Sequence, residues 1–142
     1  MKYAQLFTCL AATATVSGAA VNKKATAPPY FILIGDSTVT DGAGWGGAFV
    51  NLITGSAEGE NRAVSGRTAQ SWQSNGRWDA LLQTVNETVA DWEPIVTMQF
   101  GHNDQKAVTT DEYRVTLEDM TTQLKGAGAT PVCISQYQYQ LR

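Results

Sequence analysis

The sequence has 142 residues, a length that suits one domain with a buried core and argues against a second domain. It carries 13 acidic and 10 basic residues, and the resulting formal net charge of −3 argues against nucleic acid as a partner.

The chain begins with a pattern that is typical of a secretory signal peptide. Lys2 precedes an apolar and small-residue stretch from Leu6 to Val16, and the small residues Ser17-Gly18-Ala19-Ala20 follow. We predict a signal peptide over residues 1–20, cleavage near Ala20, and a secreted, extracellular protein. The stretch is too short, and too rich in Ala and Thr, for a membrane anchor. No later segment is long and apolar enough to cross a membrane, so we expect no membrane association.

Residues 21–29 form a polar leader that ends in Pro28-Pro29, and we expect the folded domain over residues 30–142. Because Pro cannot continue a helix, the leader suits an extended approach to a first strand. The apolar run Tyr30–Ile34 predicts that strand. A loop rich in Gly and Asp follows it, from Asp36 to Gly44.

The rest of the chain alternates helical and strand patterns. Apolar residues at helical spacing predict the helices, runs rich in β-branched and aromatic residues predict the strands, and Thr109 with Glu112 matches a helix-capping box. In chain order we predict a helix over Trp45–Ile53, a strand over Asn61–Val64, a helix around Trp78–Val85, a strand over Ile95–Phe100, a helix from Thr109 to Gly126 and a strand over Pro131–Ser135. This alternation indicates an α/β fold: a doubly wound parallel sheet with right-handed crossovers and helices on both faces, forming a three-layer α/β/α sandwich.

Three motifs follow the ends of predicted strands: Gly35-Asp36-Ser37, Asn61 to Arg67, and Gly101-His102-Asn103-Asp104. The carboxyl ends of parallel strands meet at one edge of a sheet, so the motifs are expected to share a cleft. Ser37 would be the nucleophile there. Its own N–H, the Gly66 N–H and the Asn103 amide would form an oxyanion hole.

Each of these residues also has a structural interpretation. Gly-Asp-Ser and Asn103 occur in ordinary turns, and Gly66 can be a simple hinge with positive φ. Asp104 fits a loop or capping carboxylate, and Arg67 either holds a carboxylate of an acidic sugar or braces a loop. The large aromatics Trp45, Trp72 and Trp78 either stack on sugar rings or fill the core.

Together the motifs resemble the first three sequence blocks of the SGNH, or GDSL, hydrolases, and most specifically their rhamnogalacturonan acetylesterase branch. The resemblance extends over roughly residues 30–134 and is carried by Gly35-Asp36-Ser37-Thr38, Gly44-Trp45-Gly46, Gly66-Arg67-Thr68 with Ser71, and Phe100-Gly101-His102-Asn103-Asp104. It implies a flavodoxin-like fold. It also implies an enzyme that removes acetyl groups from pectic polysaccharide (rhamnogalacturonan). It also implies Ser37 as nucleophile, the oxyanion hole named above, acetylated polysaccharide as partner, and no metal or organic cofactor.

The family keeps its catalytic Asp and His in a fourth block, Asp-x-x-His, near the C-terminus, and this chain ends before such a block. The only histidine, His102, belongs to the third block and is not the base by this resemblance. We therefore expect a C-terminally incomplete fold, with activity absent or severely impaired and an exposed edge prone to dimerisation or aggregation. Two alternatives stay open: a GDSL esterase or lipase acting on other small or lipid esters, and a non-catalytic glycan-binding or gene-model fragment.

Two further features concern the secreted form. Asn86-Glu87-Thr88 matches the acceptor pattern for N-linked glycosylation and predicts a glycan on Asn86. Cleavage near Ala20 would remove Cys9 and leave Cys133 as the only cysteine of the mature chain. Cys133 would then be either a buried, inert thiol or paired with a cysteine outside this sequence.

Overall fold

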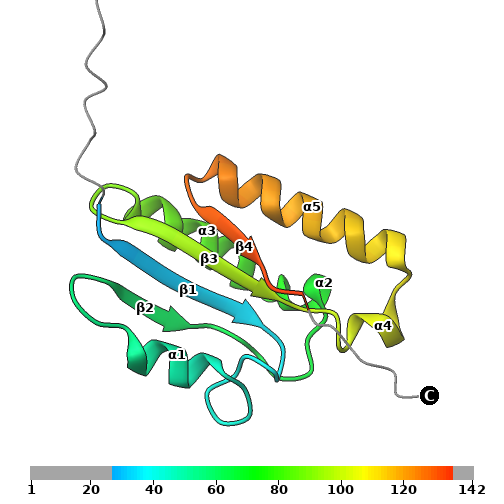
Figure 1. The fold of residues 1–142 in the computed structure, drawn as a ribbon. Helices are drawn as coiled ribbons and strands as arrows, with labels where there is room; N and C mark the ends of the chain where they lie inside the picture. Colours follow the sequence, from blue (N-terminus) through cyan, green and yellow to red (C-terminus); the bar gives the residue numbers. More distant parts are fainter. Residues whose placement is uncertain (1–26, 136–142) are drawn as a thin grey trace, which may run out of the picture.

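The computed structural model describes residues 27–135 (Figure 1). The predicted signal peptide, most of the polar leader and residues 136–142 lie outside the described residues. The elements in chain order are β1 (Pro29–Gly35), α1 (Gly46–Leu52), β2 (Glu58–Asn61), α2 (Ala69–Trp72), α3 (Arg77–Thr88), β3 (Glu93–Gln99), α4 (Asp104–Ala107), α5 (Thr110–Gly126) and β4 (Thr130–Cys133). None of the described helices is long and apolar enough to span a lipid bilayer.

The four strands form one parallel sheet in the order β2-β1-β3-β4. In the register, Phe31 of β1 lies between Gly59 of β2 and Ile95 of β3. The strand order reverses between β1 and β3, so the loops that leave these two strands diverge at their carboxyl ends. This is the position where open α/β sheets bind ligands. In Figure 1 all four strands point toward the end of the sheet where α2 and α4 lie.

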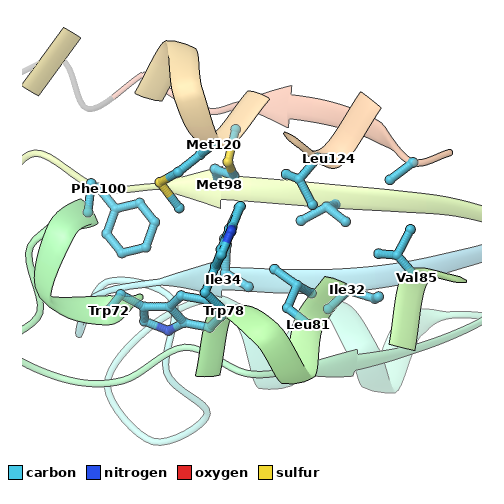
Figure 2. Packing of buried hydrophobic residues seen from close by; sticks show 13 residues of the cluster. Ile32, Ile34, Trp72, Trp78, Leu81, Val85, Met98, Phe100, Met120 and Leu124 are labelled. Atoms are coloured by element: carbon cyan, nitrogen blue, oxygen red, sulfur yellow. The ribbon is translucent and has the colours of Figure 1, made fainter. Parts of the chain in front are cut away.

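Helices cover both faces of the sheet, as the alternating pattern predicted. On one face Phe31 of β1 contacts Phe49 of α1, with ring centroids 5.3 Å apart. On the other face α2, α3 and α5 pack against β1 and β3 (Figure 2). That core contains Ile32, Ile34, Ala69, Trp72, Trp78, Leu81, Val85, Val96, Met98, Phe100, Met120, Leu124 and Ala129. The three-layer α/β/α architecture is therefore confirmed.

Two of the tryptophans belong to this core and are not available to stack on sugars. Trp72 is 1% exposed and Trp78 is 7% exposed, and their rings meet edge to face at 6.5 Å. Each indole N–H has an acceptor: Trp72 Nε1 donates to the Arg62 carbonyl at 3.1 Å and Trp78 Nε1 donates to Gln123 Oε1 at 2.7 Å. Trp45 is only half-buried and precedes α1.

The second strand lies earlier than the sequence pattern predicted. It runs over Glu58–Asn61 rather than Asn61–Val64. Its residues are polar and show no strand pattern, and the strand forms by pairing with β1. The two backbones approach closely there, since a Cβ on Gly59 would lie 2.7 Å from the Phe31 carbonyl oxygen. Residues 62–64 are not part of the strand, although the N–H groups of Arg62 and Val64 donate to the Leu33 and Gly35 carbonyls of β1 at 2.8 and 3.0 Å. The four-residue helices α2 and α4 were not predicted, because so short a helix shows no apolar period.

Candidate active site

Ser37 lies in a tight turn directly after β1. A Cβ on Gly35 would lie 2.6 Å from the Gln99 carbonyl oxygen, so only glycine fits where the chain leaves the strand. Asp36 is fully buried, and its Oδ1 accepts from the Thr38 N–H at 2.9 Å and from Thr38 Oγ1 at 2.7 Å. The turn therefore holds Asp36 inward and leaves Ser37 half-buried at its tip.

The segment that carries Gly66 is held beside this turn. Val64 N–H donates to the Gly35 carbonyl at 3.0 Å. Asn61 Nδ2 donates to the Val39 carbonyl and to Asp41 Oδ1, each at 2.7 Å. The second motif is thus hydrogen-bonded to both sides of the Ser37 turn.

Gly66 itself is exposed and has a φ of 75°, a backbone conformation that favours glycine. A Cβ placed there would meet no atom within 4 Å, so the obstacle to substitution is the backbone conformation rather than crowding. The space above Gly66 is open to an incoming ligand.

Asn103 follows β3 and directly precedes α4. Its side-chain Nδ2 donates to the Arg67 carbonyl at 3.0 Å. An amide nitrogen carries two hydrogens, so this bond fixes the side chain and leaves a second N–H for a ligand. The bond also joins the third motif to the second, 36 residues apart in the chain.

Asp104 makes a second connection between the same motifs. It is 3% exposed; its Oδ1 accepts from the Ala69 N–H at 2.8 Å and its Oδ2 accepts from the Gly101 N–H at 3.0 Å. Ala69 is the first residue of α2. The interpretation of Asp104 as a capping or loop carboxylate is confirmed. The sequence did not predict that its partner would be the distant Ala69 N–H.

Tyr113 of α5 contacts the chain directly before the third motif. Its hydroxyl donates to the Phe100 carbonyl at 3.0 Å. Burial raises the pKa of Tyr113 to about 12, with further contributions from the negative charges of Asp104, Cys133 and Asp36. No sequence signal pointed to this residue, because only the tertiary fold brings it to Phe100.

The structure therefore brings Ser37, Gly66 and Asn103 to the carboxyl ends of neighbouring strands, as the motifs predicted. His102, on the same loop as Asn103, is half-buried. Among residues 27–135 no side chain forms a hydrogen bond with the Ser37 hydroxyl. In the same range no group of three His, Cys, Asp or Glu side chains could hold a metal ion.

The remaining predicted residues lie away from this cluster. Asn86 is exposed on α3, where a glycan has access. Cys133, on the edge strand β4, is exposed and unpaired with any described cysteine. The alternative of a buried thiol is therefore wrong for the described part of the chain, in which β4 pairs with β3 alone.

Curated relatives align with more than half of the chain. The rhamnogalacturonan acetylesterase RhgT of Bacillus subtilis is 33% identical over 121 residues, which are 78% of this chain and 50% of the relative. The rhamnogalacturonan acetylesterase of Emericella nidulans is 34% identical over 83 residues, 58% of this chain and 31% of the relative. The chain thus spans about half the length, or less, of these relatives. No family model matches it.

Two solved structures share the fold at low sequence identity. The psychrotrophic esterase EstA from Pseudoalteromonas aligns with a TM-score of 0.59 and 19% identity over 76% of this chain and 60% of its own. TesA aligns with a TM-score of 0.59 and 18% identity over 77% of this chain and 61% of its own.

Proposed function

Because this chain belongs to the SGNH, or GDSL, hydrolase family, we propose that it supplies the nucleophile and the oxyanion hole of a secreted carbohydrate esterase. The substrate would be an acetylated pectic polysaccharide, as the names of the curated relatives suggest. The observation that carries the proposal is the set of hydrogen bonds that join the segments carrying Ser37, Gly66 and Asn103 at the strand ends.

In the proposed reaction Ser37 Oγ attacks the carbonyl carbon of the acetyl group while a base takes its proton. The carbonyl oxygen becomes an oxyanion, which accepts hydrogen bonds from the Ser37 N–H, the Gly66 N–H and the free N–H of Asn103. The bond to the sugar oxygen then breaks, that oxygen takes up the proton, and an acetyl-serine remains. Water then attacks the acetyl-serine carbonyl in the same way, which releases acetate and restores the Ser37 hydroxyl.

Positioning of the donors before the reaction favours this chemistry. The Asn103 amide is already held by the Arg67 carbonyl, and the Gly66 segment by the Val64 bond to Gly35. Donors that need no rearrangement stabilise a developing charge more effectively, and loss of one commonly costs about 3 kcal/mol of transition-state stabilisation. In this proposal the base comes from an Asp-x-x-His block outside the 142 residues, and His102 is not assigned that role.

The test is hydrolysis of p-nitrophenyl acetate and acetylated rhamnogalacturonan by the full-length protein from a secreting host. We expect Ser37→Ala to lower kcat by at least about a thousandfold, because the covalent route is lost. Ser56→Ala, on an exposed loop, serves as the control and should be unchanged. The intact mass of the same material reports removal of residues 1–20 and a glycan on Asn86.

Equal hydrolysis by Ser37→Ala and wild type would refute the proposal. Faster turnover of long acyl chains than of acetyl esters would instead favour a lipase-like GDSL enzyme. We expect the 142-residue chain alone to have little or no activity.

A further inference from the structure

The peptide unit between Phe100 and Gly101, directly after β3, is held by side chains from two helices. Its carbonyl, that of Phe100, accepts from the Tyr113 hydroxyl of α5 at 3.0 Å. Its N–H, that of Gly101, donates to Asp104 Oδ2 of α4 at 3.0 Å. The two groups belong to one planar unit and point in opposite directions, so rotation of the unit breaks both hydrogen bonds.

The backbone at Gly101 does not fix this orientation by itself. Its φ is 122°, a region that other residues rarely adopt and that glycine leaves at little cost. The Tyr113 hydroxyl lies beside it, since a Cβ placed on Gly101 would be 3.3 Å from that oxygen. Tyr113 and Asp104 therefore select one orientation of the peptide from the several that glycine allows.

The orientation of this peptide sets the path of the turn that carries Asn103. The Gly101 carbonyl accepts from the Gln105 N–H at 3.1 Å, and this bond closes the turn around Asn103. Both backbone polar groups of Gly101 are thus bonded to residues that follow Asn103. A rotated peptide would break this arrangement and displace the Asn103 side-chain amide.

The residue before Phe100 joins the same segment to the nucleophile. The Gln99 carbonyl, at the end of β3, accepts from the Asp36 N–H at 3.4 Å. Asp36 directly precedes Ser37 in the turn after β1. The peptide that Tyr113 holds therefore lies between this link to the Ser37 turn and the Asn103 amide. Its rotation would change the position of the amide relative to Ser37.

The start of α5 fixes where Tyr113 leaves the helix. This helix begins next to α4 at the carboxyl end of the sheet (Figure 1), and the Tyr113 N–H donates to the Thr109 carbonyl at 3.0 Å. The Tyr113 side chain is half-buried and packs against the core. Burial raises the pKa of Tyr113 to about 12, so its hydroxyl stays protonated and remains a donor at neutral pH.

We propose that Tyr113 is a positioning residue for the oxyanion hole: its hydroxyl holds the Phe100–Gly101 peptide, and through it the Asn103 amide, in the orientation that the reaction needs. This inference rests on the esterase function proposed above and adds a residue to it. The acetyl carbonyl gains its negative charge only in the transition state, so a displaced donor lowers kcat and leaves KM nearly unchanged.

Hydrolysis of p-nitrophenyl acetate by the full-length protein tests the proposal. For Tyr113→Phe we expect kcat to fall about tenfold at unchanged KM. Asn103→Ala should lose about a hundredfold by itself. Adding Tyr113→Phe to Asn103→Ala should have no further effect, because the donor that Tyr113 positions is then absent. Tyr30→Phe is the matched control: it removes the same hydroxyl at the amino end of β1 and should leave kcat unchanged.

Hydrogen exchange of the Gly101 N–H, followed by NMR, tests the contact without catalysis. In Tyr113→Phe exchange should accelerate more at Gly101 than at Val96, whose N–H lies in the central strand β3 and reports global stability. The proposal is overturned if Tyr113→Phe keeps the wild-type kcat, if it lowers kcat equally with and without the Asn103 amide, or if exchange at Gly101 does not change. Absence of hydrolysis by wild type, with exchange at Gly101 responding as expected, would reject the esterase function and still support the hold of Tyr113 on this peptide.

Discussion

Asp104 is the residue whose contacts join the second and third motifs most firmly. A carboxylate has only acceptors, and here both oxygens accept backbone N–H groups from segments 35 and three residues away. Because the group is 3% exposed, water cannot replace a lost partner. The positions of Gly66 and Asn103 relative to each other therefore depend on this side chain as well as on the Asn103 bond to Arg67.

For Asp104→Asn we expect a loss of about 1–3 kcal/mol in the free energy of unfolding. Asparagine offers one acceptor, and its NH₂ group faces the second N–H, which is then left unpaired. Urea denaturation measures the loss, and faster hydrogen exchange at Ala69 or Gly101 locates it. Asp91→Asn, which removes the same charge from an exposed turn, should change stability by less than about 0.5 kcal/mol. Equal stability of the two variants would show that the Asp104 contacts contribute little.

Among the elements, α5 has the clearest start signal. Thr109 Oγ1 accepts from the Glu112 N–H at 3.2 Å, and Glu112 Oε2 accepts from the Thr109 N–H at 2.7 Å and from its hydroxyl at 2.8 Å. These bonds, first the one from the Thr109 backbone, lower the pKa of Glu112 below its usual range. The capping box predicted from the sequence is confirmed, and the helix it begins buries Met120 and Leu124.

Removal of this cap gives a pH-dependent prediction. Thr109→Ala should destabilise the protein by about 1 kcal/mol near neutral pH. A lowered carboxyl pKa means that Glu112 stabilises the fold above its unfolded pKa and loses this effect as the pH falls through its folded pKa. The variant keeps the bond from the backbone N–H of residue 109 to Glu112 and loses only the one from the hydroxyl. The difference in stability between wild type and variant should therefore narrow in part in acid.

Thermal unfolding followed by circular dichroism between pH 3 and 7 measures how this stability difference changes with pH. The interval brackets the usual Glu pKa of about 4.3. Thr122→Ala, in the middle of the same helix, should be neutral or slightly stabilising, because alanine favours the helix. A constant difference across the range would show that the bond from the Thr109 hydroxyl to the Glu112 carboxylate contributes little to stability.

At the scale of the whole molecule the sheet is covered unevenly. β4 pairs with β3 alone among the described strands, and Val132 on it is 40% exposed. Beside it a hollow of about 580 Å³ lies along α5, lined by residues that include Tyr113, Leu117 and Cys133. An exposed strand edge next to apolar surface is a surface that promotes self-association.

We expect the 142-residue chain to associate as its concentration rises, observed as larger species in sedimentation velocity. Val132→Lys should shift the distribution toward monomer, because a charge on an edge strand disfavours pairing with another strand. Leu52→Lys adds the same charge at a residue that is 78% exposed on α1, across the sheet from β4, and should have little effect. Association that is identical in all three proteins would place the contact elsewhere.

Local patterns were enough to predict the main elements and the positions of the motifs. The apolar run before Gly35, the β-rich run before Gly101 and the capped helix after Thr109 each contain their signal within a few neighbouring residues. The polar strand β2 was misplaced, because its register depends on backbone pairing with β1 rather than on its own side chains.

The sequence by itself determined the α/β alternation and the placing of Ser37, Gly66 and Asn103 after strands, since period and turn chemistry are local properties. Only the tertiary structure decided that Asp104 binds Ala69 and that Asn103 binds the Arg67 carbonyl. Those contacts join residues that are distant along the chain. They exist only because parallel strands in the order β2-β1-β3-β4 bring their carboxyl ends to one edge of the sheet.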